Sequence, residues 1–227
     1  MQRIYLPKHV FFCGQGDALI FLDLKHDEYT MLYGQEANTF RSLCECGSGT
    51  GAQGKDAPVD VEDFIAAGLI TTDETNGKPI APSALSPPLT ALSDTRSACG
   101  RVKVSYIFSF FVACITASIR LRRQSIQAIV SGVERRRRER LTPNPHADVR
   151  ALVTAFHRLR HFYPRSYLCL FDSLALLEFL ARYNFFPRWI FAVKFDPWVA
   201  HCWVQQGDMC LNQEVEDASD YVPIMSA

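Results

Sequence analysis

The chain has 227 residues, a length that suits one or two compact domains. Its composition, 48% hydrophobic and 21% charged, is close to the globular average and excludes bulk disorder. The 24 basic and 24 acidic residues cancel, but residues 1–80 carry 6 basic and 12 acidic side chains, whereas residues 81–227 carry 18 and 12. This asymmetry favours two units that attract each other or bind different ligands.

The cysteines bear on the redox compartment. There are 8 of them, but the sequence from Met1 to Pro7 lacks the apolar core of a secretory signal peptide. We therefore expect a cytoplasmic protein with reduced thiols, most of which behave as small buried hydrophobic groups. That structural interpretation covers Cys13, Cys44, Cys46, Cys99, Cys114, Cys202 and Cys210.

Residues 1–78 have the pattern of a small sheet followed by helices. Short apolar or alternating runs between turn residues predict a three-stranded meander, with strands over residues 9–13, 18–24 and 28–32. Helical spacing then predicts helices over residues 35–46 and 59–67. We expect a winged-helix-like domain.

The acidic balance of this first domain argues against DNA binding, because gripping phosphates requires clustered Lys and Arg. A peptide added along the exposed sheet edge is the more economical ligand. The alternative is a domain that serves only for docking and binds no peptide ligand. The segment 79–100 is rich in proline and in small or polar residues and predicts a linker, which leaves residues 101–227 for the second domain.

The second domain begins with an uncharged segment, residues 104–119, bracketed by Lys103 and Arg120. This segment is about four residues short of a comfortable membrane span, so a buried helix is predicted and a peripheral membrane contact is less favoured. The arginine-rich run at 134–140 has no interleaved aromatic residues and predicts a solvated helix end rather than a nucleic-acid site. A further helix is expected over residues 148–162.

Cys169 opens an apolar helical run. Pro164 ends the preceding helix and Ser166 is a candidate N-cap, so Cys169 falls in the first helical turn. There the helix dipole and free backbone N–H groups stabilise a thiolate and an oxyanion. Behind it lies an apolar stripe of Leu170, Leu174, Leu177 and Leu180.

His201 lies on the second strand of a predicted hairpin. Strands are expected over residues 187–195, 199–204 and 209–212. A helix packed on this small antiparallel sheet brings a thiol at its start to the imidazole, as a nucleophilic Cys–His pair requires. The alternative is an inert core cysteine and a structural histidine. A zinc site from His201, Cys202 and Cys210 is disfavoured because adjacent strand residues point to opposite faces. No metal or cofactor is predicted.

The stretches from Cys169 to Arg182 and from Ala192 to Asn212 resemble the B proteins of lasso-peptide biosynthesis, which have a transglutaminase-like, papain-related core. The first 75 residues resemble the RiPP recognition element fused ahead of that core. The resemblance implies an α+β protein: a winged-helix-like domain, then a helical region leading into a helix packed on a small antiparallel sheet.

The function that the resemblance implies is cleavage of the leader from a lasso precursor peptide, before an ATP-dependent, asparagine-synthetase-like cyclase closes the ring. Cys169 would be the nucleophile and His201 the general base, then the general acid. The leader would add as a strand beside residues 28–32 and rest on the last helix, with contacts to Tyr29, Met31, Leu32 and Phe64.

The chain departs from this family at Gln213, where an aspartate is usual. An amide orients an imidazole but stabilises imidazolium less than a carboxylate does. Asp208, Asn212 and Glu214 are alternatives for the third member of the site. The departure motivates a second hypothesis, a non-catalytic adaptor that only binds the leader. A third is a transglutaminase-type acyl transferase, in which an amine replaces water.

Overall fold

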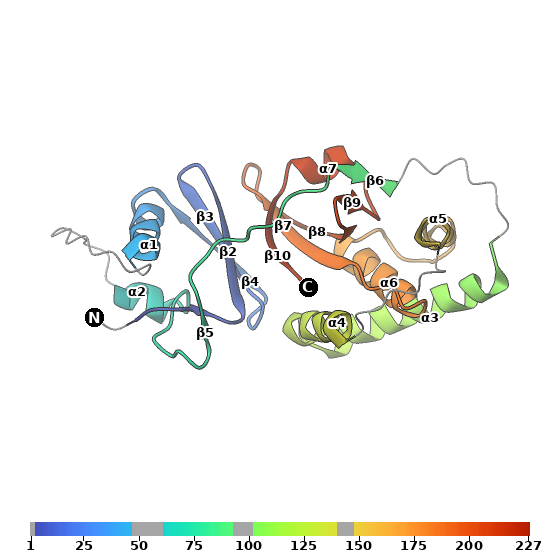
Figure 1. Cartoon of the computed structure of the whole chain (residues 1–227), viewed down its shortest axis with the longest axis horizontal. Helices are drawn as coiled ribbons and strands as arrows, with labels where there is room; N and C mark the ends of the chain where they lie inside the picture. Colours follow the sequence, from blue (N-terminus) through green and yellow to red (C-terminus); the bar gives the residue numbers. More distant parts are fainter. Residues whose placement is uncertain (1–2, 47–60, 93–101, 140–147) are drawn as a thin grey trace. The chain divides into compact units, whose positions relative to one another are not determined.

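The computed structural model describes residues 3–46, 61–92, 102–139 and 148–227 (Figure 1). The chain divides into two compact units, Met1–Ala84 and Leu85–Ala227. The division falls within the segment 79–100, for which a linker is predicted. Each unit is described below by itself.

The N-terminal unit is built on a three-stranded antiparallel sheet in the order β2 (Val10–Gln15), β3 (Ala18–Asp23), β4 (Glu28–Tyr33). This confirms the predicted meander. Helices α1 (Gly34–Cys46) and α2 (Val61–Ala66) follow, close to their predicted positions. The sequence did not indicate the two-stranded pairing of β1 (Leu6–Pro7) with β5 (Gly77–Lys78).

Aromatic packing joins the sheet to both helices in the N-terminal unit. The Phe40 ring of α1 lies edge-on to Phe21 of β3 at 4.8 Å, and edge-on to Phe64 of α2 at 5.6 Å between centroids. Phe12 of β2 completes the cluster. Such pairs add about 0.5–1.5 kcal/mol each beyond the area they bury.

The C-terminal unit contains a five-stranded sheet in the order β10 (Val222–Ser226), β7 (Arg188–Lys194), β8 (Val199–Gln206), β9 (Met209–Cys210), β6 (Thr90–Ala91). The predicted hairpin is β7–β8, in which His201 pairs with Ala192. The linker prediction is wrong for Thr90 and Ala91, because they pair in parallel with β9, and Leu92 beside them is buried. A two-residue edge strand has no periodicity that a sequence pattern could detect.

Five helices complete this unit: α3 (Val104–Arg123), α4 (Ile126–Glu139), α5 (Val149–Arg160), α6 (Cys169–Ala181) and α7 (Val215–Ser219). Helix α6 is central, with β8 on one side and α3 and α5 on the other (Figure 1). Nine of its residues are buried: Phe171 and every residue from Ser173 to Leu180. The sheet and the outer helices therefore fix the start of α6.

Helix α3 differs from its prediction. It was expected to be buried, but only one face is, through Ser109, Phe110, Ala113, Cys114 and Ala117. By length and composition alone, it is the one helix among the described residues that could cross a membrane. Only the apolar side chains on one face of α3 are explained by packing on the protein. Those on the other face remain exposed.

The basic run of α4 agrees only in part with the prediction of a solvated helix end. Arg135 and Arg138 are exposed, as predicted, and Arg138 pairs with Glu134 at 2.7 Å. Arg136 instead contacts Glu178 of α6 at 2.7 Å, and Arg120 of α3 pairs with the same carboxylate. This cluster ties three helices together. Its charges hold the pKa of Glu178 below the ordinary value, although burial alone would raise it.

Candidate active site

The start of α6 is organised by a carboxylate inside the helix. Ser166, the predicted cap, does not cap it; Leu168 occupies the N-cap position and offers no side-chain hydrogen bond. Instead, the backbone N–H of Leu168 donates to Asp172 Oδ2 at 2.8 Å. An acidic side chain in the first turn also complements the helix dipole. Asp172 thus fixes the backbone immediately before Cys169.

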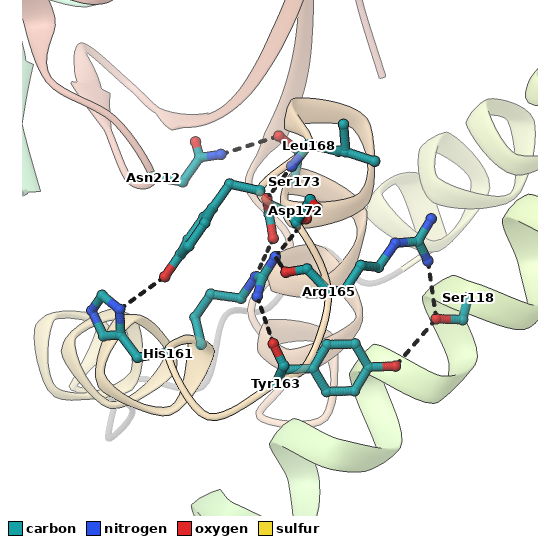
Figure 2. Close-up of polar contacts among 11 residues, drawn as sticks. Ser118, His161, Tyr163, Arg165, Leu168, Asp172, Ser173 and Asn212 are labelled. Atoms are coloured by element: carbon teal, nitrogen blue, oxygen red, sulfur yellow. Dashed lines mark hydrogen bonds and ion pairs between the residues drawn. The ribbon is translucent and has the colours of Figure 1, made fainter.

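Arg160, at the end of α5, holds the loop that leads to Cys169. Its side chain is only 3% exposed and pairs with Asp172 through Nε. Its terminal nitrogens donate to three backbone carbonyls of the loop, those of Tyr163 at 3.2 Å and of Arg165 and Ser166 at 3.0 Å (Figure 2). One buried guanidinium therefore satisfies both the carboxylate and the loop.

Side chains of the same loop anchor it to the outer helices. Tyr163 Oη and Arg165 Nη1 both contact Ser118 Oγ of α3 at 3.3 Å. Tyr167 Oη contacts His161 Nδ1 at 2.9 Å. Figure 2 shows these contacts around the start of α6. Cys169 accordingly follows a loop that is tied at several points.

Cys169 and His201 line the same cleft, and each shifts the pKa of the other. Hydrogen bonds from the Cys202 thiol and then from His201 lower the pKa of Cys169 from 9.0 to about 4, against the opposing effect of partial burial. The positive charge of the imidazolium and the backbone N–H of Cys202 act in the same direction. A pKa this low favours the thiolate form of Cys169 at neutral pH.

The imidazole of His201 lies between Cys169 and Gln213. Its Nε2 donates to Gln213 Oε1, since an amide oxygen only accepts. The other ring nitrogen, Nδ1, is left for the thiol. Burial would lower the pKa of His201, but the hydrogen bonds to Cys169 and Gln213 and the nearby Asp217 together raise it. The arrangement is a Cys–His–Gln triad in geometry.

Cys202 follows His201 on β8 and lines the same cleft as Cys169. It is buried, which raises its own pKa well above the ordinary value, so it stays protonated and donates. Ser173 Oγ donates to the Cys202 carbonyl at 3.2 Å and accepts from Asn212 Nδ2 at 3.1 Å. Asn212 Oδ1 in turn accepts from the backbone N–H of Val204 at 2.8 Å.

A cleft of about 500 Å³ opens over this site. Cys169, His201 and Gln213 line it. The other lining residues are Phe156, His157, Arg160, Tyr167, Leu168, Asp172, Lys194, Cys202, Asn212, Asp217, Asp220 and Tyr221. The volume suits a few residues of an extended peptide rather than a whole folded substrate.

Among the four candidates for the third member, the geometry selects Gln213. Asn212 is used by Ser173 and Val204. Asp208 is exposed, and its carbonyl bonds to Leu89 and Thr90 of the sheet edge. The exposed Glu214 precedes α7 at its N-cap position. Within the described ranges, no group of three or more His, Cys, Asp or Glu side chains could hold a metal ion.

The predicted leader-contact residues divide into two sets. Tyr29 and Met31 are half-buried on β4, which is an edge strand of its sheet. Leu32 and Phe64, at 7% and 4% exposed, belong to the hydrophobic core instead. The prediction of peptide contacts is wrong for these two, because their surfaces are already covered by Phe40 and its neighbours.

Sequence reasoning missed the functional positions of Arg160, Asp172 and Cys202. Asp172 had a detectable signal, since it is an acidic residue in the first turn of a predicted helix. Arg160 had none, because a lone arginine near a helix end is normally solvated. Cys202 was considered only as inert core or as a zinc ligand.

Comparisons with known proteins agree with this geometry. The family described as Transglutaminase-like superfamily matches residues 111–226, which include Cys169, His201 and Gln213. No RiPP recognition element and no lasso-specific family was found. No curated protein and no solved structure matched. The matched span is half of the chain, and the chain belongs to the transglutaminase-like superfamily.

Proposed function

We propose that this chain is a cytoplasmic cysteine peptidase that removes the leader of a lasso precursor peptide and leaves the core for a partner cyclase. The observation that carries the peptidase assignment is the position of Cys169, which begins a buried helix and shares a cleft with His201. Its neighbours lower its pKa to about 4, which favours a nucleophilic thiolate. The superfamily includes cysteine peptidases. The resemblance from Cys169 to Asn212 supports the lasso precursor as substrate.

The reaction begins when the Cys169 sulfur attacks the carbonyl carbon of the scissile peptide bond. The negative charge moves to the carbonyl oxygen, where the free N–H groups of the first turn of α6 stabilise it. The C–N bond then breaks, and the leaving amine takes the proton from His201. A thioester of the leader with Cys169 remains, and the core peptide departs with a free N-terminal amine.

Water resolves the thioester. Neutral His201 accepts a proton from the attacking water, the C–S bond breaks, and the leader leaves as a carboxylic acid. The imidazolium is restored by that proton, and the thiolate by the departing sulfur. Throughout, Gln213 holds His201 Nε2 and keeps Nδ1 aimed at the reacting atoms. An amine in place of water would give acyl transfer by the same groups.

The N-terminal unit binds the leader in this proposal, as a winged-helix-like recognition element. The edge position of β4 supports strand addition, with Tyr29 and Met31 at the added strand. The acidic excess of residues 1–80 supports a ligand other than nucleic acid. The asparagine-synthetase-like cyclase then acts on the released amine.

The test uses the full chain and the short precursor encoded by a neighbouring reading frame. We expect cleavage that yields a leader acid and a core amine by mass spectrometry. Cys169→Ala should abolish cleavage and leave leader affinity unchanged, and Cys210→Ala is the matched control because Cys210 is a buried thiol outside the cleft.

Three outcomes separate the alternatives. Cleavage by Cys169→Ala would exclude the thioester mechanism. Leader binding without cleavage by the unmodified chain, with or without the cyclase, would assign it as an adaptor; the amide at Gln213 motivates that alternative. A product joined to an added amine would assign an acyl transferase.

A further inference from the structure

One face of α3 exposes a row of large apolar side chains. We define the α3 stripe as Val104, Ile107, Phe108, Phe111, Ile115 and Ile119. Val104 is 81% and Phe108 66% exposed. Spacings of three and four residues put all six on one side of the helix, over about 22 Å at 1.5 Å per residue. A contiguous exposed apolar surface of this kind marks an interaction site.

The opposite face of α3 holds the helix in the protein. Phe110 packs edge-on against Phe156 of α5 at 5.4 Å, and Tyr183 Oη contacts Ser109 Oγ at 3.0 Å. Arg120 pairs with the buried Glu178. Crossing a bilayer would break all of these contacts, so a membrane could only meet α3 lengthwise, along the stripe.

Cations flank both ends of the stripe. Lys103 precedes α3 and is exposed, and Arg122 and Arg123 are exposed in its last turn. Helix α3 contains no acidic residue. In the parts of the chain that the structure describes, no carboxylate lies within 4.0 Å of Arg122 or Arg123. Residues 81–227 also carry 18 basic and 12 acidic side chains.

We propose that the α3 stripe docks the C-terminal unit on an anionic phospholipid surface, with α3 parallel to the membrane. Apolar side chains enter the interface while the flanking cations meet lipid phosphates. A lipid surface fits better than a protein because no residue of the stripe carries a polar group with which a partner could set register or specificity. No stripe residue lines the cleft of Cys169, so the inference is independent of the proposed reaction.

Vesicle flotation with the full chain tests the proposal. We expect co-flotation with vesicles of phosphatidylcholine and phosphatidylglycerol, little with phosphatidylcholine alone, and release by added salt. Phe108→Glu with Ile115→Glu should abolish binding. Arg122→Gln with Arg123→Gln should weaken it by about 25-fold, since each cation near an anionic surface strengthens binding about fivefold.

Two matched controls should bind like the unmodified chain. Leu89→Glu changes another exposed apolar residue of the same unit, 73% exposed. Arg150→Gln with Arg188→Gln removes the same charge from other exposed positions. All variants alter exposed side chains, and unchanged circular dichroism and Cys169 alkylation rates would verify their folding.

Three results would overturn the proposal: no binding to anionic vesicles, equal binding by the stripe variants and their controls, or equal binding to neutral vesicles. Sedimentation, which measures the oligomeric state, could give a fourth result that overturns the proposal. If the unmodified chain dimerises, and Phe108→Glu with Ile115→Glu makes it monomeric without changing vesicle binding, the stripe is an interface between two copies.

Discussion

His201 Nε2 donates a hydrogen bond to Gln213 Oε1, and this contact decides which ring nitrogen faces Cys169. An amide acceptor keeps the proton on Nε2 in both the neutral and the charged imidazole. Nδ1 is therefore the nitrogen that exchanges a proton with the thiol and later with the leaving amine. Several consequences of this arrangement can be measured.

Gln213→Ala should lower kcat for precursor cleavage by about tenfold, the effect of losing one hydrogen bond of about 1.4 kcal/mol. Gln213→Asp should preserve cleavage and raise the pKa of His201 further, because a carboxylate stabilises imidazolium. The basic limb of the pH–rate profile would then move to higher pH. An unchanged profile in both variants would show that Gln213 does not act through His201.

Cys169 should react with iodoacetamide at similar rates at about pH 6 and pH 8. The rate of an ordinary thiol falls by roughly 100-fold when the pH is lowered from 8 to 6. Cys169 differs because its pKa is about 4, which leaves it ionised at both values. Mass spectrometry of the labelled peptides measures the rates. A free cysteine-containing peptide is the control, and a 100-fold decrease for Cys169 would contradict the ion pair.

Cys202→Ala should raise the pKa of Cys169, because the thiol donor next to the thiolate is lost. Cys202→Ser should raise it less, since a hydroxyl also donates. The pH midpoint of Cys169 alkylation measures both shifts. A purely structural role for Cys202 predicts lower stability with an unmoved midpoint, and that result would remove Cys202 from the site.

Asp172→Asn should slow Cys169 alkylation and lower stability by about 3 kcal/mol, the usual cost of leaving a buried charge unpaired. Arg160 would lose its counter-ion while still holding three loop carbonyls. Urea unfolding and labelling kinetics give the two values. Asp208→Asn, at an exposed position, is the control, and equal effects of the two changes would refute this role for Asp172.

Glu178→Gln should lower the free energy of unfolding by about 3 kcal/mol at neutral pH, since two arginines lose their shared carboxylate. The pKa of Glu178 is lowered by folding, so its stabilisation is present above the ordinary value of 4.5 and is lost as pH falls through the lowered value. The difference from the unmodified chain should therefore shrink in acid. Glu134→Gln, which breaks an exposed pair with Arg138, should cost less than about 1 kcal/mol.

The sequence by itself determined the features that depend on neighbouring residues. Alternation and turn residues predicted the meander of β2, β3 and β4, and the same signals predicted the β7–β8 hairpin. The proline and the apolar stripe around Cys169 predicted a helix that begins there. A thiol at a helix start and an imidazole on the next strands were enough to predict that Cys169 and His201 meet.

Tertiary structure alone decided the features that depend on contacts between distant segments. Gln213, rather than Asp208 or Asn212, reaches His201 because the chain turns after β9 in one particular register. Leu32 and Phe64 are core residues because α1 and α2 cover them. The exposed face of α3 carries larger apolar side chains than its buried face, so only packing determines which one stays exposed. Periodicity records how a side chain projects from its own element, whereas a partner on another element is set by the folded backbone.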